Sequence, residues 1–126
     1  MIHFLSPLNV NLDDSDRKIK ATLLAEFVCM VDCIKIAVPS GFETNLASIP
    51  RVVWSIPGFA PFGRIEKPSV LHDYLYSKDC PIDISRQKAD EILVDGMKTE
   101  GENWLVRRTV YIVVRGFGAS HWRVSP

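Results

Sequence analysis

An alternating apolar run at residues 27–38 is the feature that most constrains the fold of this chain. Apolar residues occupy every second position on both sides of a break at Asp32-Cys33, namely Phe27, Cys29 and Val31, then Ile34, Ile36 and Val38. A period of two places alternate side chains on one face of a β-strand. Pro39 and Gly41 then stop the pattern. The run therefore predicts two strands joined as a β-hairpin.

Three segments in the second half of the chain show helical spacing. The first is expected to begin near Pro68, because a proline suits the first turn of a helix, where its missing N–H is not needed. The second starts in "DISRQKAD", with Asp83 or Ser85 as N-cap, and stops before Gly101. The third covers about residues 104–115. Helical spacing joins Leu71 and Leu75 in the first helix, and Ala89, Ile92, Leu93 and Met97 in the second.

The remaining segments show no regular period. Residues 1–19 are polar and predict a loosely packed N-terminal arm, followed by a single globular domain at residues 20–126. Prolines and glycines between Pro50 and Gly63 forbid a long regular element there, and the aromatic residues among them predict a loop that packs against the core. We expect an α+β fold, with a small β-hairpin or sheet, an irregular aromatic loop and three packed helices.

Size and charge restrict the class of protein. With 126 residues, of which 47% are hydrophobic and 24% charged, the chain fits one globular domain. Its formal net charge is zero, so we expect no specific nucleic-acid binding. Near-zero charge favours self-association or a protein partner, and the oligomeric state stays open. We expect no secretion signal, and "WLVRRTVYIVVRGFG" is too short and too charged for a transmembrane segment.

The three cysteines, Cys29, Cys33 and Cys80, are an odd number without paired spacing. Cys29 and Cys33 lie in or beside the alternating run, where we expect buried thiols. A zinc site would need a CxxC pair with histidines nearby, and the sequence has no such pair. Reduced thiols suit a cytosolic protein.

The stretch "VLHDYLYSKD" at residues 70–79 places two titratable groups in an otherwise apolar helix. Its two leucines define the buried face of that helix. His72 then lies on one flank, beneath Tyr76 at position i+4, whereas Asp73 points nearly opposite the leucines. The two groups therefore serve different neighbours, or one small site at the edge of the helix.

Asp90, on the second helix, is the expected partner of His72. It lies close to an apolar face, where an unpaired charge is costly, and two antiparallel helices would bring the two positions together. This arrangement predicts a general base with an orienting carboxylate, and Asp73 beside it as an oxygen ligand for a hard cation. A His–Asp pair that joins two helices is more often structural than catalytic, and both interpretations stay open.

Other polar groups carry weaker signals. Thr44, Asn45 and Ser48 in "TNLASIP" offer hydrogen bonds to a ligand, or else form a turn or a helix cap. A group of arginines and aromatic residues near the C-terminus suits phosphate or a nucleic-acid base, although such arginines more often face solvent or pair with acidic groups. The group comprises Trp104, Arg107, Arg108, Tyr111, Arg115 and Trp122, with His121 as a surface residue. No Walker loop, GxGxxG or zinc-ligand pattern is present.

Five blocks follow in order over roughly residues 35–122, namely "VPSGFETNLASIPR", a Pro/Gly-rich loop, "SVLHDYLY", "SRQKADEILVDGMK" and "VVRGFGASHW". In this combination the chain resembles the phage and prophage family called domain of unknown function 1353. Where relatives usually read Thr-Asp, this chain has Thr44-Asn45, so it lacks an acidic group at that position. The resemblance implies a phage origin, often near tail or lysis genes, and a location in the host cytoplasm or on the virion.

The site itself is similar to the core of the phospholipase A2 families, which have HDxxY on one helix and an aspartate on the next. Here "HDYLY" precedes a helix that contains "ADEIL". This resemblance implies that His72 activates water and that Asp90 orients it. It also implies that Asp73 holds Ca2+ and that Tyr76 braces the carboxylates. Carbonyls from the loop 58–63 would complete the calcium shell, although only two glycines there match the glycine-rich calcium loop.

Two functions follow as expectations, and the sequence leaves open whether the chain is an enzyme. The first is a phage-encoded accessory protein with a divalent-cation-assisted His/Asp site that hydrolyses an ester or phospholipid. Its residues would be catalytic His72 and Asp90, the metal ligand Asp73, and supporting Tyr76, Asn45 and Ser48. The second is a non-enzymatic protein that binds a virion or tail component or a host defence protein. Exposed Trp104 and Trp122 would suit that surface, with the His-Asp motif as scaffold.

Overall fold

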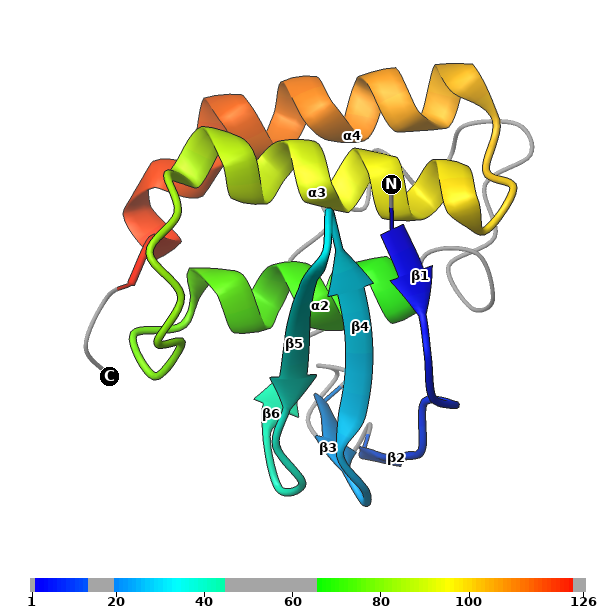
Figure 1. Cartoon of the computed structure of the whole chain (residues 1–126). Helices are drawn as coiled ribbons and strands as arrows, with labels where there is room; N and C mark the ends of the chain where they lie inside the picture. The colour runs from blue at the N-terminus through cyan, green and yellow to red at the C-terminus, as the bar shows by residue number, and fades with distance from the viewer. Residues whose placement is uncertain (1, 14–19, 45–65, 124–126) are drawn as a thin grey trace.

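The computed structural model of the chain describes residues 2–13, 20–44 and 66–123. These residues form two small antiparallel sheets and three α-helices, so the expected α+β class is confirmed (Figure 1). One sheet has the strand order β1-β4-β5, and the other has the order β2-β3-β6. The strands are β1 (Ile2–Phe4), β2 (Val10–Asp13), β3 (Lys20–Leu23), β4 (Phe27–Val31), β5 (Ile34–Val38) and β6 (Glu43–Thr44).

Strands β4 and β5 form the predicted hairpin. They pair antiparallel with Val31 opposite Ile34, and Asp32 and Cys33 form the turn between them. Both turn residues have positive φ, 47° and 73°, as a two-residue type I′ turn requires, and this turn suits the right-handed twist of the strands. Five of the six alternating apolar residues are buried, whereas Ile34, next to the turn, is exposed.

The N-terminal residues differ from the expected irregular arm. Strand β1 pairs with β4, which places Ile2 opposite Val31, and Ile2 is buried in the core. Strand β2 pairs with β3. The expectation of an irregular, loosely packed arm is therefore wrong for residues 2–13. Strands of three or four residues are too short to show a period, so their pairing is set by the strands beside them. The division into an arm and a domain stays a prediction.

The helices begin and end close to the predicted positions. They are α2 (Glu66–Tyr76), α3 (Arg86–Thr99) and α4 (Trp104–Phe117), followed by the 3-10 helix η2 (Gly118–His121). Ser85 is the N-cap of α3, and its hydroxyl accepts a hydrogen bond from the backbone N–H of Lys88. Asn103 caps α4 in the same way. Gly101, with φ of +87°, lies in the turn between α3 and α4, where a positive φ favours glycine.

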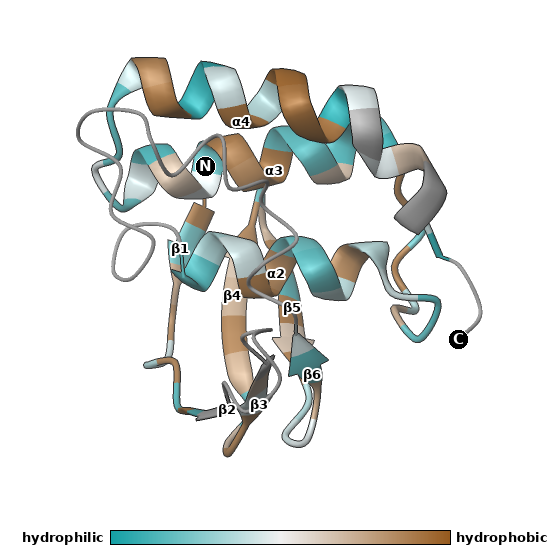
Figure 2. Ribbon diagram, turned by 180° about the vertical axis from the view of Figure 1, so that it is seen from behind, coloured by the Kyte–Doolittle hydropathy of each residue, from teal (hydrophilic) through white to brown (hydrophobic). Residues whose placement is uncertain are grey.

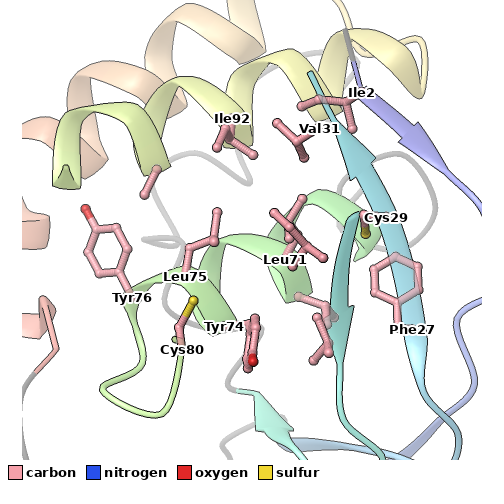
Figure 3. Packing of buried hydrophobic residues seen from close by; sticks show 14 of the residues in the cluster. Ile2, Phe27, Cys29, Val31, Leu71, Tyr74, Leu75, Tyr76, Cys80 and Ile92 are labelled. Atoms are coloured by element: carbon pink, nitrogen blue, oxygen red, sulfur yellow. The ribbon is translucent and has the colours of Figure 1, made fainter. Parts of the chain in front are cut away.

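The core lies between the β1-β4-β5 sheet and the helices. Helix α2 packs beside β4 and β5, α3 covers α2, and α4 forms the outermost helical layer (Figure 1). Figure 3 shows Leu71 and Leu75 of α2 among the side chains that fill this space, with Phe27 and Cys29 coming from β4. A second apolar cluster joins α3 to α4. It consists of Leu93, Met97, Val106, Val110 and Val114, with Val113 packed against it.

The cysteines follow the predicted burial only in part. Cys29 is fully buried on β4, and burial raises the pKa of its thiol to about 12. Cys33 is exposed, so the expectation of a buried thiol is wrong there, because the residue occupies the hairpin turn. Cys80 is buried and, like the other two, has a free thiol. Within the described ranges, no helix has the length and apolar character needed to cross a membrane.

Candidate functional site

The predicted contact between His72 and Asp90 is present. Helices α2 and α3 pack against each other and place His72 Nε2 2.9 Å from Asp90 Oδ1. Asp90 is completely buried, and the side chain of His72 keeps 10% of its surface exposed. The spacing on the two helices predicted this pair, since both residues lie on flanks next to apolar faces.

Asp90 is the centre of a larger network than the sequence predicted. The Tyr76 hydroxyl donates a hydrogen bond of 2.6 Å to Oδ1. On the other oxygen, Arg115 Nη1 donates a bond of 3.0 Å to Oδ2, and Arg86 Nη1 lies 3.7 Å away. We call Asp90, His72, Tyr76, Arg86 and Arg115 the Asp90 network. It joins α2, α3 and α4, so it contributes to the fold as well as to the site.

Sequence reasoning missed both arginines of the network. Arg86 lies four residues before Asp90 on α3, and this i, i+4 spacing was a usable signal. Arg115 carries no local signal, because its pairing depends on how α4 packs against α3. Arg86 also donates to the carbonyl oxygens of Val114 and Arg115 at 3.1 and 3.2 Å. A cation there satisfies free carbonyls and the negative end of the α4 dipole.

The charge of Asp90 fixes the position of the proton on His72. Burial would raise the pKa of Asp90, but hydrogen bonds from His72, Tyr76 and Arg115 together hold that pKa below its usual value. An ionised carboxylate only accepts hydrogen bonds, so His72 Nε2 is the donor to Oδ1. In the neutral imidazole, Nδ1 then carries a lone pair. Nδ1 is therefore the nitrogen that can act as a base.

Tyr76 holds the histidine ring in place. The two rings lie 4.3 Å apart between centroids, as expected for positions i and i+4 of a helix. Burial and the hydrogen bond to Asp90 raise the pKa of Tyr76, so its hydroxyl stays protonated and remains a donor. Figure 3 shows this hydroxyl end directed toward α3. Tyr76 thus supports Asp90 and His72 together.

The segment after α4 closes over Tyr76. The Trp122 ring meets the Tyr76 ring edge-on at 5.0 Å, and the backbone N–H of Arg123 donates to the Tyr76 carbonyl at 2.7 Å. A Cβ on Gly118 would lie only 2.6 Å from the Tyr76 hydroxyl oxygen. Glycine is therefore needed at position 118 for this close approach. Trp122 is partly buried by these contacts, so the expectation that its side chain is exposed is wrong.

Asp73 lies on the other flank of α2. The hydroxyl of Thr44, at the end of β6, donates a hydrogen bond to Asp73 Oδ2. Thr44 is buried, whereas Asp73 keeps part of its surface exposed. The two groups of the His-Asp motif therefore have different neighbours, as the helix geometry predicted. The other two members of the predicted polar cluster, Asn45 and Ser48, lie outside the described residues.

The metal prediction has support from only one described carboxylate. In the described part of the chain, no group of three or more His, Cys, Asp or Glu residues is arranged to hold a metal ion. Calcium takes six to eight oxygen ligands, so Asp73 and its described neighbours alone do not fit a calcium shell. The loop 58–63, from which further carbonyl ligands were expected, lies outside the described residues. Calcium stays a prediction.

The basic and aromatic residues of α4 separate into two groups. Arg115 faces Asp90, whereas Trp104 is exposed on the outer face of α4. The guanidinium carbon of Arg108 lies 5.7 Å from the centre of the Trp104 ring. The structure therefore does not gather these residues into one phosphate site. The side chain of His121 lies outside what the structure describes.

A comparison with protein families supplies one match. The family described as Protein of unknown function (DUF1353) matches residues 21–114, which is most of the chain. The matched range contains Thr44, His72, Asp73 and Asp90, and it ends one residue before Arg115. Neither a search of curated proteins nor a search of solved structures finds a match.

Proposed function

The chain belongs to the family described as Protein of unknown function (DUF1353), and we propose that it is a phage-encoded accessory protein with a hydrolase-like site. His72 is the general base of this site, Asp90 orients it, and an ester or phospholipid is the substrate class. One observation carries the proposal. In the neutral imidazole, the 2.9 Å contact between His72 Nε2 and Asp90 Oδ1 leaves the lone pair on Nδ1, on a side chain that keeps 10% of its surface exposed.

The proposed reaction needs one base that can take and return a proton. Nδ1 of His72 takes a proton from water while the water oxygen forms a bond to the carbonyl carbon of the ester. The Asp90 carboxylate stabilises the resulting imidazolium. His72 then gives the proton to the leaving alcohol oxygen as the ester C–O bond breaks. The products are a carboxylic acid and an alcohol, and His72 ends the cycle neutral.

The Asp90 network supports this role because it holds the base rigidly. Catalytic groups act best when neighbouring side chains fix their orientation. Here Asp90 Oδ1 and the Tyr76 ring hold the imidazole, and Arg115 and Arg86 hold the carboxylate in turn.

Asp73 is the proposed cation ligand, and calcium is the proposed ion. Its partly exposed carboxylate beside His72 in sequence, on a different flank of α2, supports this assignment. Because the described residues supply fewer oxygens than calcium requires, no step of the proposed reaction passes through a metal. The proposed binding of Ca2+ can therefore be wrong while the proposed reaction at His72 still holds.

A second function is supported by a different observation. Trp104, Leu105 and Ile112 expose 63%, 51% and 59% of their surface on α4. Exposed aromatic and aliphatic residues beside an arginine are typical of binding surfaces. Under this alternative the protein binds a virion, tail or host component, and the Asp90 network serves only the fold.

Hydrolysis by the purified protein separates the two functions. Chromogenic esters of increasing chain length and phospholipid vesicles are the substrates. We expect His72→Gln to lower the rate roughly 100-fold or more, the usual contribution of a general base. His3→Gln, an exposed histidine on β1, is the matched control and should leave the rate unchanged. Circular dichroism confirms that both variants fold. Hydrolysis that His72→Gln retains, or that the wild type lacks on every substrate, would contradict the proposal.

A further inference from the structure

The outer face of α4 exposes large apolar side chains that the Asp90 network does not use. Trp104, Leu105 and Ile112 are each more than half exposed. The other exposed large hydrophobic residues in the described ranges are scattered over strand ends and turns, which is normal for a protein surface. On α4, three such residues fall within nine positions, so they form one patch, which we call the α4 outer patch.

The helical geometry gathers this patch on one side of α4. Leu105 and Ile112 are seven positions apart, so they share a face, and Arg108 lies between them. The opposite face of α4 is buried against α3. Figure 1 shows α4 as the outermost helix, and Figure 2 shows hydrophobic and hydrophilic residues interleaved along it. The patch therefore lies on the outward surface of a helix that no other described helix or strand covers.

The charge of α4 restricts what can cover the patch. The helix contains Arg107, Arg108 and Arg115 and no acidic residue. Arg115 pairs with Asp90, and Arg107 is partly buried with its Nε covered, so Arg108 supplies the outward positive charge of the patch. The whole chain balances 15 basic against 15 acidic residues, so the rest of the molecule is net acidic. This asymmetry favours an anionic surface against α4 in particular.

We propose that the α4 outer patch docks on an anionic lipid surface. Leu105 and Ile112 enter the interface, Trp104 lies at the level of the headgroups, and Arg108 contacts their phosphates. A convex helix needs no complementary groove in a fluid interface, and aromatic, aliphatic and arginine side chains on one helix are typical of interfacial binding.

A second copy of the chain fits the patch less well. In an antiparallel pair of α4 helices, each Leu105 would meet the Ile112 of the other copy. Each Arg108 would then lie opposite Thr109 of the other copy, which places the two arginines next to each other near the centre, where like charges repel. A stable interface buries roughly 800 Å² per partner, and the patch comprises only three large apolar side chains.

The docking is independent of the proposed hydrolysis. His72 lies between α2 and α3, whereas the α4 outer patch faces away from α3. Docking through the patch tethers the protein to a lipid surface without placing His72 on it. The inference therefore goes beyond the proposed hydrolysis, and the two can succeed or fail separately. It assigns to a lipid surface the α4 residues that the alternative function assigns to a protein partner, so those two assignments exclude each other.

Co-sedimentation with vesicles of ether-linked phospholipids tests the docking, because ether lipids contain no carboxylic ester for the proposed reaction. We expect the wild type to sediment with vesicles that contain equal parts phosphatidylglycerol and phosphatidylcholine, and not with phosphatidylcholine alone. The double variant Leu105→Gln/Ile112→Gln should lose binding more than ten-fold. Arg108→Gln should weaken it roughly five-fold, the usual contribution of one basic residue at an anionic surface. The His72→Gln variant should bind like the wild type.

Leu24→Gln is the matched control, since Leu24 is 64% exposed between β3 and β4, away from α4. It should leave vesicle binding unchanged. Three outcomes would overturn the proposal. In the first, the wild type does not sediment with anionic vesicles. In the second, Leu24→Gln lowers vesicle binding as much as the double variant does. In the third, light scattering shows a wild-type dimer that becomes a monomer in the double variant. The last outcome would make the patch an interface between two copies of the chain.

Discussion

The two flanks of helix α2 show how neighbouring residues acquire different roles. On the flank toward α3, His72 and Tyr76 share the Oδ1 atom of a fully buried aspartate that two arginines also approach. On the flank toward β6, Asp73 accepts a hydrogen bond from Thr44 and keeps part of its surface exposed. The difference lies in burial, because a buried charge requires partners on every side, whereas an exposed carboxylate can exchange them with solvent.

This contrast predicts a separation of stability from function. Changes in the Asp90 network should destabilise the fold, since it joins three helices. Changes at Asp73 should leave the fold intact and act only on what binds there. If substitutions in the Asp90 network and at Asp73 lower the free energy of unfolding equally, the two flanks do not differ in this way.

The largest effect is expected for Asp90→Ala. Removing this carboxylate leaves the charges of Arg86 and Arg115 without their buried partner, which costs roughly 3 kcal/mol. We choose the low end of the usual range because both arginines are partly exposed, at 20% and 32%. Urea unfolding measures the loss. Asp95→Ala on the exposed side of α3 is the control, and its change should stay within about 0.5 kcal/mol. If the two variants lose the same free energy of unfolding, the Asp90 network does not stabilise the fold.

The next largest effect concerns two glycines near the end of α4. A Cβ at Gly118 would meet the Tyr76 hydroxyl, so Gly118→Ala should cost roughly 1–3 kcal/mol through overpacking. A Cβ at Gly116 meets nothing within 4 Å, so Gly116→Ala should stabilise the helix by up to about 1 kcal/mol. Thermal unfolding of the pair gives the comparison directly. If Gly118→Ala leaves the free energy of unfolding unchanged, the segment after α4 does not hold Tyr76 in place.

The pH dependence of stability sharpens the contrast further. Burial opposes the charge on Asp90, but its hydrogen bonds lower its pKa below that of an unfolded aspartate, about 3.9. The stability from Asp90 is therefore present above about pH 4 and is lost as pH falls through the folded pKa. Urea midpoints measured toward acid pH should fall for the wild type and fall less for Asp90→Asn. Parallel curves would mean that Asp90 carries no such linkage.

The smallest effect on stability is expected at Asp73. Asp73→Asn keeps an oxygen that accepts from Thr44, so it should cost less than about 1 kcal/mol. If calcium binds there, a ten-fold excess over Kd stabilises the wild type by about 1.4 kcal/mol, or several degrees in Tm. The variant should lose this shift, and zinc or chelator should not produce it. If calcium does not raise the Tm of the wild type, calcium is not a ligand of Asp73. The proposed role of His72 as a base does not depend on this result.

The sequence predicted those parts of the fold that depend on local period. The β4–β5 hairpin, the Ser85 cap and the His72–Asp90 contact all follow from spacing within one or two adjacent elements. Strand β1 was not predicted, because three residues show no period and its pairing partner lies more than twenty positions away.

The sequence predicted the central contact of the candidate site, between His72 and Asp90, but not the contacts that surround it. Arg115 and Gly118 reach Asp90 and Tyr76 only through the packing of α4 and η2, which no nearby sequence pattern encodes. The block "VVRGFGASHW" is part of the family resemblance, but it does not indicate which residues this segment contacts. Arg86 was missed as well, although its i, i+4 spacing from Asp90 is visible in the sequence.

The tautomer of His72 decides whether its Nδ1 can act as the base of the proposed reaction. Long-range 1H–15N NMR spectra of the folded protein at a pH where the ring is neutral distinguish the two ring nitrogens. His72→Gln assigns the signals among the three histidines of the chain. We expect a proton on Nε2, donated to Asp90, and a lone pair on Nδ1. Asp90→Asn should mix the two forms. A proton on Nδ1 in the wild type would contradict the account, because His72 would then have no free base for the proposed reaction.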